Sequence, residues 1–146
     1  MIFRQLYEPL SSTYTYLIGD INTGQAVLID PVIATMERDL AEVHKLGLKL
    51  AYTVDTHIHA DHITAALEMK RAVGSKIAAP AYDRLACADV GLEEGIPFEV
   101  DGITLQPLHT PGHTAGHFAY LYNDRVFTGD ALLIEGCGRT DFQHGD

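Results

Sequence analysis

The sequence predicts a mixed α/β domain. Three segments have the apolar spacing of amphipathic helices, and they are interspersed with short strand-like segments up to about residue 90. From residue 98 to about residue 128 the chain contains strand-like segments only. Its 146 residues are 47% hydrophobic and 21% charged, which fits one globular domain over residues 1–146 with a buried core.

The first strands are expected at Phe3–Tyr7 and Thr13–Ile18, where apolar and polar residues alternate. A turn at Asp20–Gln25 follows, because Gly24 can adopt the positive φ that such turns need. The run Ala26–Asp30 is apolar and short, and a proline follows it directly. We therefore expect a third strand there.

Helices are expected at Met36–Leu46, Ile63–Val73 and Ala81–Ala88. Gly47 and Gly74 stand directly after the first two, in the position where glycine commonly ends a helix. Further strands are expected between and after these helices, at Leu48–Val54, Lys76–Pro80, Phe98–Val100, Ile103–Leu108, His117–Leu121 and Val126–Thr128.

Charge and cysteine content exclude several classes of protein. The net charge of −10 argues against nucleic-acid binding, which relies on clustered lysine and arginine. No apolar run has the length of a membrane span, and the first twenty residues lack the pattern of a signal peptide. Two cysteines are too few for a disulfide framework, so the cytoplasm is the expected compartment. Cys87 lies in a predicted helix and is expected to be a small core residue of it.

Residues 56–62, "THIHADH", hold three histidines and an aspartate directly after a predicted strand. In extended backbone His57 and His59 point the same way, so both can reach one ion. Asp61 and His62 then lie at the start of the next helix. Imidazole and carboxylate ligands suit zinc, iron or manganese, so this segment predicts a metal site.

Two later loops can complete such a site. His113 lies in "LHTPGHTAGH", a Gly/Pro-rich loop between two predicted strands, and Asp130 follows a strand in "FTGDALL". Loops at strand ends are frequent positions for functional residues. His113 and Asp130 are therefore candidates for a third nitrogen and a carboxylate, whereas His109 and His117 are expected to be hydrogen-bonding residues.

These motifs resemble those of the metallo-β-lactamase superfamily. Within it, "FTGDALLIEGCGRTDFQHGD" is similar to the persulfide dioxygenases, whereas the related glyoxalase II enzymes usually lack the TDFQ continuation. The resemblance implies an αββα sandwich with the metal at one edge of its two sheets. Members of the family extend well beyond this length, so the chain corresponds to the N-terminal part of the sandwich, with an incomplete second sheet.

For the site, the resemblance implies one Fe(II) per chain, with zinc as the alternative, held by His57, His113 and Asp130. These three residues would also be the catalytic centre. His59, Asp61 and His62 would orient the ligands or hold a second metal. Arg139 would bind an anionic substrate group or pair with Asp141.

For the function, the resemblance implies oxidation of glutathione persulfide by O₂ to sulfite and glutathione. The alternative is a binuclear thioester hydrolase like glyoxalase II, which needs a further histidine beyond residue 146. A third possibility is an inert metal-binding fragment. No nucleic-acid or membrane partner is expected, and open sheet edges favour pairing with a further C-terminal segment or with a second copy.

Overall fold

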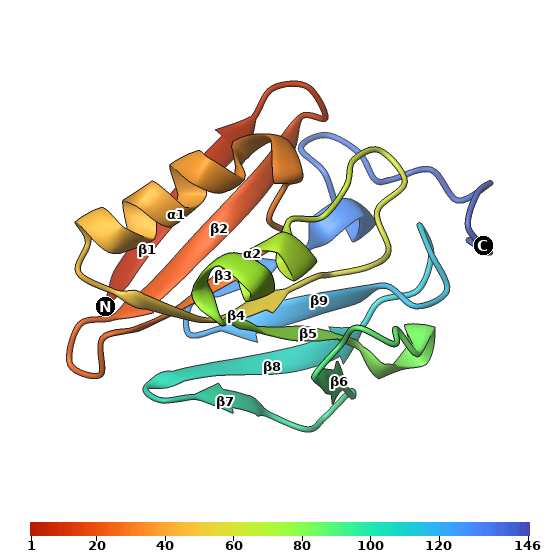
Figure 1. Ribbon diagram of the computed structural model, residues 1–146. Coiled ribbons are helices and arrows are strands. Elements are labelled where there is room, and N and C mark those ends of the chain that lie inside the picture. The colour runs from red at the N-terminus through yellow and green to blue at the C-terminus, as the bar shows by residue number, and fades with distance from the viewer.

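The computed structural model describes residues 1–146 and has three layers (Figure 1). Two helices, α1 (Met36–Lys45) and α2 (Ala66–Val73), cover one face of a six-stranded sheet, and a four-stranded sheet packs on its other face. The mixed α/β class is therefore confirmed, with three layers of the expected αββα order. Neither helix has the length and apolar character that crossing a membrane requires.

The six-stranded sheet follows chain order. Its first three strands pair antiparallel, and the remaining pairs are parallel. The third, fourth and fifth strands run in the same direction and are joined by crossover connections. Their carboxyl ends therefore lie at one edge of the sheet. The strands are β1 (Ile2–Glu8), β2 (Thr13–Asp20), β3 (Gln25–Ile29), β4 (Lys49–Val54), β5 (Lys76–Pro80) and β6 (Val90–Leu92).

Both faces of this sheet are buried, which explains why its inner strands are almost continuously apolar. Leu28 of β3 belongs to the core under the helices, together with Val43 and Met69. Its neighbours Val27 and Ile29 face the second sheet and join the larger core there. Adjacent residues of one strand thus enter two different cores, as the alternation of strand side chains requires.

The second sheet is antiparallel throughout, in the order β10-β9-β8-β7. Its inward side chains complete the larger core, whereas its outward face leaves Leu108, Leu121 and Val126 between 36% and 47% exposed. Neither helix of the chain packs on that face (Figure 1). The strands are β7 (Phe98–Val100), β8 (Ile103–His109), β9 (Phe118–Tyr122) and β10 (Arg125–Phe127).

The second helix begins three residues later than predicted. The segment preceding it is bound to the stretch after β3: Ile33 N–H donates to the Ile63 carbonyl, and Ala65 N–H donates to the Pro31 carbonyl. These hydrogen bonds tie residues 63–65 to the neighbouring segment, with Thr64 in an isolated bridge to Val32, so the helix starts at Ala66.

The helix predicted at Ala81–Ala88 is wrong. Only the short 3₁₀ turn η2 (Ala81–Asp83) forms there, and Arg84 then adopts a left-handed conformation with φ 49° that ends it. The chain instead continues to β6, which the sequence analysis did not predict. Cys87 consequently lies exposed, so its expected place in the core is also wrong.

Candidate metal centre

Three loops at strand ends bring His57, His113 and Asp130 together. His57 follows β4, His113 lies between β8 and β9, and Asp130 lies in the 3₁₀ turn η3 (Gly129–Ala131) after β10. One donor atom from each lies within 4.8 Å of the other two. Asp130 Oδ2 is 3.3 Å from His113 Nε2 and 3.8 Å from His57 Nε2.

Hydrogen bonds fix which nitrogen of His57 is free. The Thr56 hydroxyl donates to Asp30 Oδ2 at 2.9 Å, so its oxygen accepts from His57 Nδ1, also at 2.9 Å. The opposite nitrogen, Nε2, is buried without any partner. Burial, followed by the neighbouring His59 charge, lowers the pKa of His57 to about 3, so at neutral pH Nε2 carries a free lone pair.

His113 is oriented in the same manner by a different partner. Its Nδ1–H donates to the backbone carbonyl of Arg139 at 2.8 Å. Nδ1 therefore carries a proton, and Nε2 faces Asp130 on the opposite side of the ring. Both histidines thus direct Nε2 toward Asp130, and an imidazole binds a metal through such a nitrogen when it is unprotonated.

Asp130, the carboxylate between them, is positioned by a hydrogen bond from its backbone N–H to His117. Asp130 N–H donates to Nε2 of the fully buried His117 at 3.2 Å, and His117 Nδ1 donates to Thr110 Oγ1 at 2.9 Å. His117 is thus a hydrogen-bonding residue, as predicted. Burial raises the pKa of Asp130, although His113 opposes this shift. A cation placed between the three donors would stabilise the charged carboxylate and fill the space beside the orphaned His57 Nε2.

His59, Asp61 and His62 form a second group whose donor atoms lie within 4.8 Å of one another. Two of its donors are already engaged. His59 Nε2 donates to Asp30 Oδ1 at 3.0 Å, and Asp61 Oδ2 lies 3.2 Å from His62 Nδ1. His62 Nε2 is buried and unpartnered. The second group therefore offers fewer free donors than the first.

Asp30 and Asp55 are site residues that the sequence analysis missed. Burial favours the neutral form of both, but the charge and hydrogen bond of His59 outweigh it at Asp30 and lower its pKa to about 2. At Asp55 burial dominates and raises the pKa to about 7. Burial alone would lower the pKa of His59, but Asp30 raises it to about 9. One signal could have revealed Asp30: a charged residue directly after the apolar run of a buried strand.

Arg139 lies beside the site but its guanidinium is engaged elsewhere. It pairs with Asp141 through two hydrogen bonds of 2.7 and 3.0 Å, the structural pairing that the sequence analysis considered. Its side chain is 65% exposed. Its backbone carbonyl, rather than its charge, reaches the candidate ligands, through His113.

A cavity of about 650 Å³ opens beside Asp130. Its walls combine hydroxyl-bearing side chains of the β1–β2 hairpin, including Thr13, Tyr14 and Tyr16, with the apolar residues 132–134.

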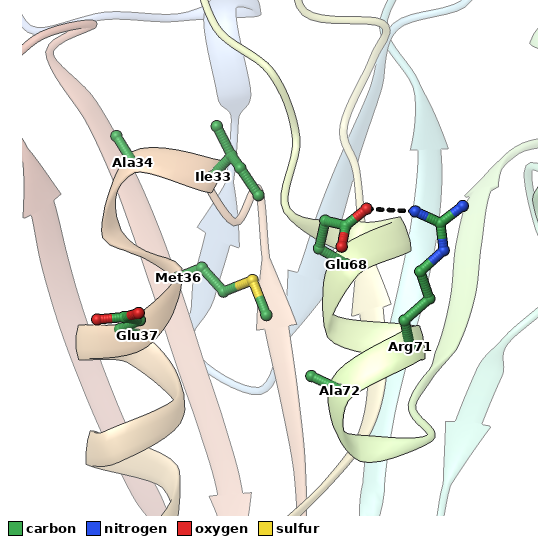
Figure 2. A pocket seen from close by; sticks show the side chains of 7 residues that line it. All are labelled: Ile33, Ala34, Met36, Glu37, Glu68, Arg71 and Ala72. Atoms are coloured by element: carbon green, nitrogen blue, oxygen red, sulfur yellow. Dashed lines mark hydrogen bonds and ion pairs between the residues drawn. The ribbon is translucent and has the colours of Figure 1, made fainter.

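A second concavity lies between α1 and α2, on the helical face of the molecule (Figure 2). There Glu68 is paired with Arg71, and Met36 and Ala72 supply apolar wall. It contains no histidine.

The sequence and the fold are similar to those of known proteins. A model of the metallo-beta-lactamase superfamily matches residues 9–146. Over 147 residues the chain is 46% identical to the mitochondrial persulfide dioxygenase ETHE1 of Bos taurus, covering 99% of this chain and 58% of that protein. The crystal structure of ETHE1 from Myxococcus xanthus matches with a TM-score of 0.97 and 51% identity, covering 100% of this chain and 64% of that one.

A hydroxyacylglutathione hydrolase of Methylococcus capsulatus is more distant, with 34% identity over 89% of this chain and 52% of that protein. The chain thus spans about three fifths of the length of the persulfide dioxygenases that it matches. The family match extends over nearly all of the sequence and includes the three loops that meet at the site. This chain belongs to the metallo-beta-lactamase superfamily.

Proposed function

We propose that the protein that contains this chain is an iron-dependent persulfide dioxygenase. The observation that carries the proposal is the meeting of the His57 and His113 imidazoles with the Asp130 carboxylate, which also lines a cavity. Two histidines and one carboxylate are the ligand set of non-haem Fe(II) oxygenases. The identity to proteins named persulfide dioxygenases supports the same assignment.

In this proposal His57, His113 and Asp130 hold one Fe(II). Bound there, ferrous iron would supply open coordination positions for a sulfur ligand and O₂, and electrons for the activation of O₂. The residues of the chain hold the ligand atoms in place: Thr56 and the Arg139 carbonyl keep protons on Nδ1, and His117 positions Asp130.

The proposed substrate is glutathione persulfide. Both atoms of O₂ are transferred to its terminal sulfur, and water then cleaves the S–S bond to release sulfite and glutathione. The cavity beside Asp130 is large enough for part of such a peptide and offers hydroxyl groups to its polar atoms. Arg139 remains a candidate for an anionic group of the substrate, although Asp141 competes for it.

A binuclear thioester hydrolase is the second candidate. It is favoured by the group of His59, Asp61 and His62 next to the first three residues, and by the similarity to a hydroxyacylglutathione hydrolase. In that case the two groups of residues would hold two metal ions, which would supply activated water for hydrolysis of a thioester. The predicted cytoplasmic location stays a prediction, since the bovine relative is described as mitochondrial.

Oxygen uptake separates these candidates. The purified protein, loaded anaerobically with Fe(II), is mixed with glutathione persulfide while O₂ consumption and sulfite are measured. The dioxygenase proposal expects one sulfite formed per O₂ consumed, and no hydrolysis of S-lactoylglutathione. Hydrolysis without oxygen uptake would favour the binuclear reading, and the absence of both activities would favour an inert metal-binding fragment.

A further inference from the structure

The loop that carries the motif histidines is poorly supported by its own backbone. From His57 to His62 no backbone N–H or C=O takes part in a backbone–backbone hydrogen bond. The loop is anchored just before this stretch by Thr56, and just after it by Ile63, whose carbonyl accepts from Ile33. Between these anchors, the positions of the imidazoles depend on contacts from elsewhere in the chain.

One such contact comes from a residue 85 positions away in the sequence. Gln143 Nε2 donates to the backbone carbonyl of Ile58 at 3.0 Å. No other hydrogen bond connects the backbone of residues 57–62 to the rest of the chain. Ile58 lies between the two histidines, so this bond holds the peptide on which both of them depend.

Gln143 belongs to a segment that we call the strap, residues 138–146, which contacts all three candidate ligand loops. Gly138 N–H donates to the Asp130 carbonyl at 2.8 Å, and the Arg139 carbonyl accepts from His113 at 2.8 Å. In Figure 1 the strap runs beside the loop between β4 and α2. Three loops that are distant in the sequence are thus bonded to one segment.

The strap is held in a backbone conformation that needs support. Gln143 and His144 both lie in the left-handed region, with φ 48° and 58°, which residues other than glycine rarely adopt. Asp146 N–H donates to the Gly112 carbonyl at 3.0 Å and fixes the end of the strap. At Gly145 a Cβ atom would stand 2.5 Å from the Gly112 carbonyl oxygen, so the close approach requires glycine.

We propose that Gln143 is a positioning residue for the metal centre: its side-chain amide fixes the Ile58 peptide and so the direction of the His57 imidazole. The inference rests on the metal site proposed above. Partners that orient ligands typically change metal affinity or activity by about 10–100-fold when they are removed. The bond from Gln143 acts on the loop in this way although it touches no candidate ligand side chain.

The test is the substitution Gln143→Met, which keeps the length of the side chain and removes the donor. Because Gln143 Oε1 is buried without a partner, the substitution also removes an unsatisfied acceptor, so the thermal unfolding midpoint should stay close to that of the parent. Cobalt(II) serves as the probe, since its affinity and its electron paramagnetic resonance spectrum both report the ligand geometry. We expect the dissociation constant to rise by about 10–100-fold and the spectrum to change.

Two further variants make the result specific. Gln106→Met, in β8, makes the same exchange at a half-buried glutamine outside the strap and should bind cobalt like the parent. Asp130→Ala tests the site itself. If Gln143→Met binds cobalt as the parent does while Asp130→Ala does not, the positioning role is wrong and the metal site stands.

If Asp130→Ala also binds as the parent does, the metal site itself is wrong, and the role of Gln143 is wrong with it. Should Gln143→Met fail to fold, Gln143→Glu replaces it, because its carboxylate has the same shape and cannot donate to Ile58. An unchanged cobalt affinity and spectrum in that variant would equally overturn the proposal.

Discussion

Two groups of histidine and aspartate stand side by side in this protein, and they differ in how their polar atoms are used. In the group of His57, His113 and Asp130, each imidazole has its Nδ1 hydrogen-bonded outside the group and its Nε2 directed at Asp130. In the group of His59, Asp61 and His62, only His62 has an unpartnered Nε2, because the Nε2 of His59 is bound to Asp30 outside the group.

The difference lies in the surroundings rather than in the residue types. Thr56 and a backbone carbonyl accept hydrogen bonds from the Nδ1 atoms of the first pair of histidines, whereas the buried Asp30 carboxylate accepts one from His59 Nε2. A motif of ligand-type residues therefore becomes a metal site only where neighbouring groups leave the correct nitrogen free. We expect the first group to bind the metal and the second to support it.

The largest effect is expected from Asp130→Ala, which removes the only carboxylate of the first group. When free Fe(II) is present at one hundred times its dissociation constant, binding stabilises the folded parent by about 2.7 kcal/mol. This raises the thermal unfolding midpoint by roughly 5–10 °C. The variant should gain none and should retain only background iron. Anaerobic thermal scans with and without Fe(II) measure this, and an equal gain in both proteins would place the metal elsewhere.

Asp30→Asn should have the next largest effect, because Asp30 accepts from the Thr56 N–H, the Thr56 hydroxyl and His59. Removing one charge of a buried pair typically costs about 3–5 kcal/mol. We expect a loss of that size in urea unfolding, together with weaker metal binding. Asp124→Asn is the control, since Asp124 is exposed and pairs only with its neighbour Arg125. Comparable losses in both variants would show that Asp30 has no special role.

Thr56→Val removes the hydroxyl that accepts from His57 Nδ1 and keeps the shape of the side chain. Without this hydroxyl no hydrogen bond keeps the proton of His57 on Nδ1 and leaves Nε2 available for the metal. Metal affinity should therefore fall by about 10–100-fold. Thr53→Val is a matched control: Thr53 is fully buried in the preceding strand, and its hydroxyl has no partner. A metal titration in which the two variants lose affinity equally would contradict the role of Thr56.

The smallest effect on metal content is expected from His62→Ala. Because His62 belongs to the supporting group, activity should drop by about 10–100-fold while the metal content per chain stays that of the parent. Metal analysis of the purified variant, paired with an oxygen-uptake assay, separates the two quantities. A loss of half the metal would instead indicate that His62 holds a second ion.

The candidate ligands could be predicted from the sequence because each lies in a loop directly after or between strands with clear apolar patterns. Asp30 was missed because an acidic residue before a proline also reads as an ordinary strand end. The contact from Gln143 to Ile58 spans 85 positions, so no local pattern contains it.

The errors in secondary structure have a related cause. Residues 63–65 follow a helical pattern, but their hydrogen bonds to the stretch after β3 replace the first helical turn. At Arg84 a left-handed backbone ends the 3₁₀ turn where the apolar spacing predicts a continuing helix. In both cases contacts between distant segments override the local preference, which a single sequence does not reveal.

The number of metal ions per chain tests the central claim most directly. The purified protein is reconstituted anaerobically with excess Fe(II), freed of unbound metal by gel filtration, and analysed for iron by mass spectrometry against amino-acid analysis. If only His57, His113 and Asp130 bind, one iron is found per chain, and Asp130→Ala reduces it to background. Two irons per chain, with one retained after Asp130→Ala, would show that the group of His59, Asp61 and His62 is itself a metal site and would contradict the account.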